Sequence, residues 1–378
     1  MNKKKRIPLN PFVLTGYVSP DYFCDRQKES DKIISALLNG RNITLTSPRR
    51  MGKTGLIHHV FHKMQENNDV KCFYVDLYQT DSLELLVKKL ADTILGSLDS
   101  TEDKIVKNVV SFFKMLRPVV TVDPITGEPG FKVDVEPGQG EYSLSEIFAY
   151  MEKSDYRCFV AFDEFQTIAS YADKNVEALL RSHIQRLTNV NFIFSGSQRH
   201  VLENMFASAS RPFYQSTQMM PLGDIDKSAY YAFSSDKMRN NRQSIDEETF
   251  DYLYTKLSSH TWYVHTLLNR LYESGYETID KTTVEDIMAD ILLENEGTFQ
   301  TFLRLVTPIQ AKVLYAIASE GTIKEIQGKT FLTKYRLGAA STVKTAVKSL
   351  VEKELLLDNN GEYQIYDRFF GIWLIGNN

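Results

Sequence analysis

The sequence has few of the features that mark a secreted, disulfide-bonded or membrane-spanning protein. Its 378 residues include three cysteines, Cys24, Cys72 and Cys158, and none falls in a CxxC pair. We therefore expect neither a disulfide framework nor a zinc site, and a reducing, cytoplasmic location. No apolar run approaches the ~20 residues that a membrane-spanning helix needs. The apolar run behind the basic N-terminus is broken by Pro8, Asn10 and Pro11, so it is a poor signal peptide.

The chain also lacks a strong charge of either sign. Its formal net charge is -4, which gives no global case for binding nucleic acid or a membrane surface, so any basic patch must be local. A chain of this length is too long for one compact core, and two or three domains are expected.

Strand and helix patterns alternate from about residue 21 to 220. Four near-continuous apolar runs read as strands, NITLTS, VKCFYVDLYQ, RCFVAFDEFQ and NFIFSGS, and helical patterns such as IHHVFHKMQ and LELLVKKLADTILGSL separate them. Buried strands between helices predict a parallel sheet with helices on both faces. Residues 118–137 break the rhythm with two short strands around a Pro- and Gly-rich turn, which predicts a hairpin near Val119–Val135.

The strand signals stop after residue 222. Residues 223–305 read as helices, with Ser244 as the expected N-cap of SIDEETFDYLYTKL. Residues 306–378 read as three helices and a hairpin around Asn360-Gly361, which is the winged helix-turn-helix pattern. The predicted domains are thus a core at 1–222, a helical domain at 223–305 and a winged helix at 306–378.

A phosphate-binding loop is predicted at SPRRMGKT, which matches the pattern at Gly52, Lys53 and Thr54 between a strand and a helix. Main-chain N–H groups and the helix dipole bind phosphates in such loops. Lys53 is expected to reach the β- and γ-phosphates, and Thr54 to hold Mg²⁺. Ser47 replaces the usual first glycine, which is tolerable where its φ is negative. The expected nucleotide contacts are Ser47, Pro48, Arg49, Arg50, Met51, Gly52, Lys53, Thr54 and Gly55.

The second element of the predicted site is RCFVAFDEFQ, a buried strand that ends in two carboxylates. Asp163 is expected to position Mg²⁺, and Glu164 to act as the general base on the attacking water. A strand with this ending, about 110 residues after a phosphate loop, is much less common by chance than either motif alone.

Several segments together resemble the archaeal-type ATPase family, within the AAA+/STAND class of P-loop NTPases. They are SPRRMGKT, FVAFDEFQ, NFIFSGSQRHVLENMF, RPFYQST and FFGIWL. The resemblance implies that Asp25 and Arg26 lie beside the adenine, and that Ser197 or Gln198 lies near the γ-phosphate. It also implies that Arg211 serves as a sensor or arginine finger, and that residues 223–305 form a lid.

Two further patterns remain open. His58 and His62 have a zinc-binding spacing, but the Glu of HExxH is missing, so metal binding there is not expected. In the C-terminal segment, Val343, Ala346, Val347 and Leu350 predict a buried stripe on a helix, with Thr342, Lys344, Thr345 and Lys348 facing outward. This surface suits DNA, while the alternative is a protein-docking module.

The sequence therefore predicts an ATP- and Mg²⁺-dependent ATPase that couples nucleotide state to movement of a winged helix. The alternative is a nucleotide-gated switch or DNA-binding regulator with little turnover. A homo-oligomer, in which one subunit completes another's site, is also left open.

Overall fold

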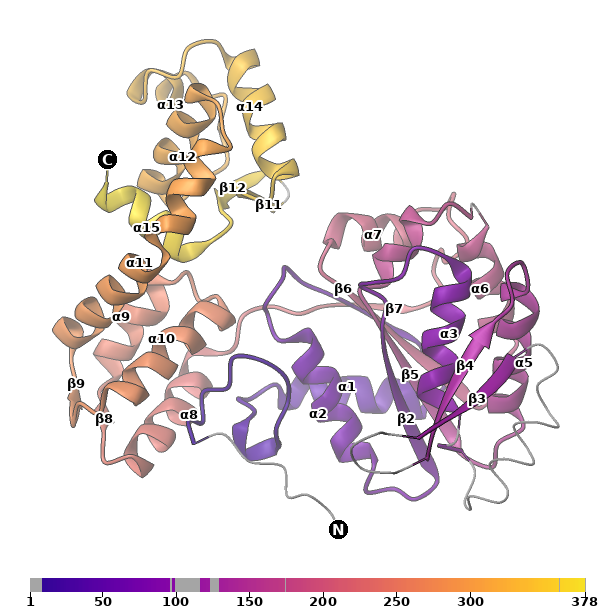
Figure 1. Ribbon diagram of the computed structural model, residues 1–378. Coiled ribbons are helices and arrows are strands. Elements are labelled where there is room, and N and C mark those ends of the chain that lie inside the picture. The colour runs from indigo at the N-terminus through magenta and orange to yellow at the C-terminus, as the bar shows by residue number, and fades with distance from the viewer. Residues whose placement is uncertain are drawn as a thin grey trace. The chain divides into compact units, whose positions relative to one another are not determined.

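The computed structural model describes residues 9–95, 97–98, 116–122, 129–173, 175–359 and 361–377. The described chain forms two compact units (Figure 1). The sheet unit is Thr15–Ile225, and the helical unit joins the residues up to Leu14 to Asp226–Asn378. The chain therefore passes between the units twice. The predicted domain boundaries at residues 222 and 305 stay predictions.

A parallel sheet forms the centre of the sheet unit, with strand order β2-β5-β6-β1-β7. Its strands are β1 (Ile43–Thr46), β2 (Val70–Asp76), β5 (Arg157–Asp163), β6 (Val190–Gly196) and β7 (Gln218–Pro221). The first four confirm the predicted strands and the predicted parallel sheet. Strand β7 was not predicted. It is a short edge strand beside β1 and ends in a proline, as edge strands can.

Helices cover both faces of this sheet (Figure 1). One buried cluster joins β1 and parts of β5 and β6 to α1 (Gln27–Leu38) and α2 (Lys53–Met64). The other face carries α3 (Leu83–Ile94), α5 (Gly140–Glu152), α6 (Val176–Ile184) and α7 (Arg199–Ala207). Two short 3-10 segments, η1 (Pro20–Tyr22) and η2 (Phe165–Ser170), complete the unit. Because both faces are covered, the inner strand β6 is buried along its whole length, and β5 is buried at every residue after Arg157.

The predicted hairpin is confirmed as β3 (Leu116–Val122) and β4 (Pro129–Val135). The two strands are antiparallel, with Leu116 opposite Val135. The turn residues 123–128 lie outside the described residues. A 2.8 Å ion pair between Lys88 and Asp134 joins β4 to α3.

The first part of the helical unit contains α8 (Lys227–Asn240), α9 (Glu247–Lys256), α10 (Thr261–Ser274) and α11 (Lys281–Arg304). Two short strands, β8 (Ser244–Ile245) and β9 (Thr278–Ile279), pair in parallel between the helices. The prediction that Ser244 caps α9 was wrong, because Ser244 belongs to β8. The cap is Asp246, whose carboxylate accepts a hydrogen bond from the Thr249 N–H at 2.7 Å.

The predicted winged helix is confirmed in the second part of the helical unit. It consists of α12 (Pro308–Glu320), β10 (Thr322–Ile323), α13 (Lys329–Lys334), α14 (Ala340–Glu352), β11 (Leu356–Asn359), β12 (Glu362–Ile365) and α15 (Arg368–Gly376). Strands β10, β12 and β11 form an antiparallel sheet. Thr307 and Gln310 form a capping box at the start of α12.

The N-terminal residues of the helical unit are anchored to α10. Asn10 donates to the Asn269 carbonyl and Asn269 donates to the Phe12 carbonyl, both at 2.8 Å. The ring of Phe12 is fully buried against His265 and Tyr272. Among the described helices, none is long and apolar enough to cross a membrane.

Candidate nucleotide-binding site

The phosphate loop connects β1 to α2. Gly52 caps α2 with φ of 90°, a backbone conformation that residues with a Cβ rarely adopt. Ser47 is not among the residues with positive φ, so serine fits where the usual pattern has glycine. The first N–H groups of α2 have no partner within the helix, and they point toward the loop that precedes it. The strand–loop–helix arrangement that the sequence predicted is therefore present.

Lys53 is held inside the loop. Its ammonium donates to the Ser47 carbonyl and hydroxyl at 3.1 Å each, and to the Pro48 carbonyl at 3.0 Å. Burial lowers the pKa of Lys53 to about 8, against the raising effects of Glu164 and Asp163. The hydroxyl of Ser47 thus has a local role that glycine could not supply.

The carboxylate of Asp163, at the end of β5, lies beside the first turn of α2. Its Oδ2 accepts a hydrogen bond from the Thr54 hydroxyl at 2.7 Å, across 109 positions of sequence. The same oxygen accepts one from the Tyr74 hydroxyl at 2.6 Å, while Oδ1 accepts the Glu164 N–H at 3.0 Å. Thr54 and Asp163 were both predicted at the magnesium site, whereas Tyr74 was not, because it belongs to no motif.

Glu164 is fixed by two neighbours. Its Oε2 accepts hydrogen bonds from the Ser197 hydroxyl, at 2.9 Å, and from the Gln166 amide. The backbone of Glu164 is left-handed, with φ of 52°, directly after the end of β5. Ser197 follows β6, the strand beside β5, so the two predicted residues do meet. The role of Gln166 was not predicted.

Two other predicted residues have structural partners. Arg26 is buried and donates to the carbonyls of Gly223, at 2.7 Å, and Asp224, at 3.2 Å. Arg211 forms an ion pair with Glu177, at the start of α6. Their expected roles toward the adenine and the terminal phosphate stay predictions.

The segment before α1 reaches α2 through Phe23. A Cβ added to Gly55 would lie 3.4 Å from the Phe23 ring, which also stacks on His59 at 4.3 Å between centroids. His59 forms a 3.1 Å hydrogen bond with the Tyr17 hydroxyl, and burial lowers the pKa of His59 to about 4. His59 therefore belongs to an aromatic cluster behind the phosphate loop.

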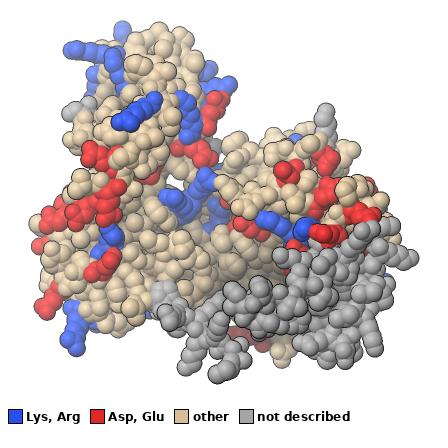
Figure 2. Space-filling model, in the orientation of Figure 1, with Lys and Arg blue, Asp and Glu red and all other residues tan. Residues whose placement is uncertain are grey.

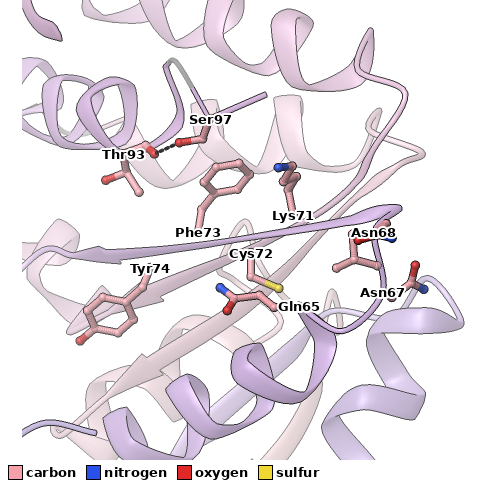
Figure 3. A pocket seen from close by; sticks show the side chains of 10 residues that line it. Gln65, Asn67, Asn68, Lys71, Cys72, Phe73, Tyr74, Thr93 and Ser97 are labelled. Carbon is pink, nitrogen blue, oxygen red and sulfur yellow. Dashed lines mark hydrogen bonds between the residues drawn. The ribbon is translucent and has the colours of Figure 1, made fainter. Parts of the chain in front are cut away.

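A pocket of about 390 Å³ lies along the edge strand β2 (Figure 3). Figure 3 shows Phe73 and Lys71 on one side of the strand, and Cys72 and Tyr74 on the other. The pocket lies among the C-terminal ends of α2 and α3 and the start of β2. Tyr74 is among its lining residues, whereas Lys53, Thr54 and Asp163 are not, so this pocket is distinct from the candidate site.

The oxygen atoms at the site are suitable ligands for a magnesium ion. Thr54 supplies a hydroxyl and Asp163 a carboxylate, which are hard ligands of the kind that Mg²⁺ prefers. The glycine-capped helix start and Lys53 are the groups that a polyphosphate needs. The residues therefore fit a magnesium–nucleotide complex.

Comparison with known proteins supports the fold. Residues 297–376 match a family described as a probable winged helix domain. A Walker-type ATPase of Pyrococcus abyssi has 17% identity and a TM-score of 0.64, covering 96% of this chain and 99% of that chain. The ORC2 protein of Aeropyrum pernix, in ADPNP–ADP complexes, has 15% identity and a TM-score of 0.57, covering 97% and 96%.

A third similar structure is the ORC1 protein of Aeropyrum pernix in complex with DNA. It has 13% identity and a TM-score of 0.53, and the match covers 98% of this chain and 97% of that chain. Among curated proteins no sequence matches. The chain shares its fold with this Walker-type ATPase and these ORC proteins, and it carries a C-terminal winged helix, as its resemblance to the archaeal-type ATPase family implied.

Proposed function

We propose that the sheet unit binds ATP with Mg²⁺ and hydrolyses it, and that the nucleotide state changes the position of the winged helix. The observation that carries the proposal is the 2.7 Å bond between Thr54 and Asp163. It joins the phosphate loop to the carboxylates of β5, which are the two halves of an ATPase site.

Each residue has a definite task in this proposal. Lys53 would exchange its bonds to Ser47 and Pro48 for bonds to the phosphates. Thr54 and Asp163 would hold Mg²⁺, which neutralises charge on the phosphates when bound. Glu164 would accept the proton of the water that attacks the γ-phosphorus, as the bond to the ADP oxygen breaks. Ser197 and Gln166 would keep Glu164 in place.

Three single substitutions test the proposal by phosphate release and by binding of a fluorescent ADP. Lys53→Ala should abolish binding, because it removes the one ammonium in the loop. Glu164→Gln should keep binding and lower turnover by about 10²-fold or more, as expected for loss of a general base. Lys63→Ala is the control, since Lys63 lies on α2 but bonds the exposed Gln27.

Equal phosphate release by wild type and Lys53→Ala would contradict the proposal. Binding of ADP without turnover would favour the second candidate, a nucleotide-gated switch. In that case ATP would act only by stabilising one conformation.

We also propose DNA as a partner of the winged helix. The predicted stripe on α14 is buried, and Thr342, Lys344, Thr345 and Lys348 are exposed, as expected of a recognition helix. Figure 2 shows lysines and arginines over the winged-helix elements, at the top of the view. The similar ORC1 structure is a complex with DNA, which supports the proposal.

Duplex DNA affinity over a salt series distinguishes DNA binding from protein docking. The double variant Lys344→Ala, Lys348→Ala should weaken binding and reduce the salt slope by about 2, because two phosphate contacts are lost. Lys281→Ala is the control, because Lys281 is also exposed but lies outside the winged helix, where it pairs with Glu248. A salt slope unchanged in the double variant would favour protein docking.

A further inference from the structure

We propose that Tyr74 is a positioning residue for the metal-binding pair Thr54 and Asp163, so that the phenol sets which oxygen of Asp163 faces Mg²⁺. This inference rests on the proposed function. It comes from the 2.6 Å hydrogen bond between the Tyr74 hydroxyl and Asp163 Oδ2, and it assigns a role to a residue outside both nucleotide motifs.

The carboxylate of Asp163 has few acceptor positions left for a metal ion. An ionised carboxylate has about four, two on each oxygen. The hydroxyls of Thr54 and Tyr74 occupy both acceptor positions of Oδ2, and the Glu164 N–H occupies one acceptor position of Oδ1. About one position is left, on Oδ1. Asp163 would therefore face Mg²⁺ through Oδ1, with Oδ2 turned to the Thr54 hydroxyl.

The structure also keeps the phenol in place as a donor. A tyrosine hydroxyl keeps its proton at neutral pH, so Tyr74 is the donor in its hydrogen bond to Asp163. The ring lies against His58 on α2, with 4.5 Å between centroids. Tyr74 thus contacts both the strand that carries Asp163 and the helix that carries Thr54, and it fixes the side chains that join them.

Tyr74→Phe tests the inference because it removes the hydroxyl and keeps the ring against His58. The measurement is binding of a fluorescent ADP in a Mg²⁺ titration and in EDTA, repeated with Mn²⁺. Loss of a residue that orients a metal ligand typically costs 10–100-fold in metal affinity. We expect Tyr74→Phe to lower the affinity for Mg²⁺ and for Mn²⁺ by about tenfold. The affinity for ADP in EDTA should change less than about twofold.

Tyr171→Phe is the matched control. Tyr171 is another tyrosine of the sheet unit, and its hydroxyl donates to Thr80 rather than to Asp163. Loss of that hydroxyl should leave the metal titration unchanged. Thermal unfolding of both variants shows whether the two lost hydroxyls have similar effects on stability.

Two results would overturn the inference. One is a Tyr74→Phe variant that binds the metal ions as wild type does, while Thr54→Ala loses them. The other is an equal loss of ADP affinity with metal and in EDTA, which would mean that Tyr74 only supports the fold. A wild-type protein that binds no ADP at all would overturn both this inference and the proposed function.

Discussion

Single residues decide whether Glu164 can be held in position, and Gly196 is the sharpest case. A Cβ added to Gly196 would lie 1.9 Å from Gln166 Oε1 and 2.8 Å from Leu202 Cδ1. Real atoms do not approach so closely, so Gln166 would have to leave its place beside Glu164. Gln166 can therefore keep its place beside Glu164 only because residue 196 has no side chain.

Gly196→Ala should therefore destabilise the sheet unit by about 1–3 kcal/mol, the usual cost of overpacking a core. It should also lower phosphate release more than ADP affinity, since the Glu164 contact is disturbed. Denaturant unfolding and a turnover assay measure the two effects. Gly223→Ala is the control, because nothing lies within 4 Å of its added Cβ. Equal stability of the two variants would contradict the prediction.

The site residues that could be predicted from the sequence are those that lie in recognisable motifs. Lys53, Thr54 and Asp163 could be predicted because the loop and the β5 carboxylates are recognisable patterns. Tyr74 could not, because its contact depends on β2 lying beside β5, in a register where Tyr74 pairs with Ala161. The ion pair of Arg211 with Glu177 likewise depends on tertiary structure, which no local pattern encodes.

At the scale of elements, the start of α9 shows how a local pattern can mislead by two residues. Ser244 and Glu247 have the spacing of a capping box, but Ser244 pairs with Thr278 in a short parallel ladder. The helix therefore begins later, and Asp246 provides the cap. A two-residue strand gives no periodicity that a sequence could show.

Asp246→Ala should destabilise the helical unit by about 1 kcal/mol, the typical cost of losing an N-cap. Ser244→Ala should cost clearly less, although Ser244 also donates to the Glu277 carbonyl at 3.2 Å. Urea unfolding, followed by circular dichroism, compares the two variants. A larger loss for Ser244→Ala would mean that Ser244, rather than Asp246, stabilises the start of α9.

The long, strongly patterned elements were predictable, and the short ones were not. Strands β5 and β6 are buried on both faces and read as continuous apolar runs. The amphipathic stripe of α14 matched its burial residue by residue. Strand β7 has four residues and ends in Pro221, so its pairing with β1 leaves almost no signal in the sequence.

At the scale of the whole molecule, the sheet unit is inserted into the helical unit. The contact between Asn10 and Asn269 spans 259 positions, and the entire sheet unit lies between them. The sequence did not suggest this, since residues 1–222 read as one domain. Phe12 follows the residues that break the N-terminal apolar run, and its ring is buried against residues of α10 that lie more than 250 positions away.

Phe12→Ala should therefore destabilise the helical unit by about 3–5 kcal/mol, the usual cost of removing a buried phenylalanine ring. The sheet unit should keep its stability and its ADP affinity, since Phe12 contributes nothing to its core. Calorimetry with and without ADP assigns each unfolding transition to one unit, because ADP raises the midpoint temperature only for the unit that binds it. Leu9→Ala is the control, since Leu9 is 97% exposed. A fall in the ADP-sensitive transition alone would contradict this assignment.

The anchoring of Phe12 has a mechanical consequence. If the molecule were stretched between Asn10 and α15, the load would run through the helical unit alone, because both points belong to it. Tension could not reach the phosphate loop until Phe12 pulled free from α10. An optical-tweezers trace should therefore show the helical unit rupture first, and the sheet unit should extend only in a later step.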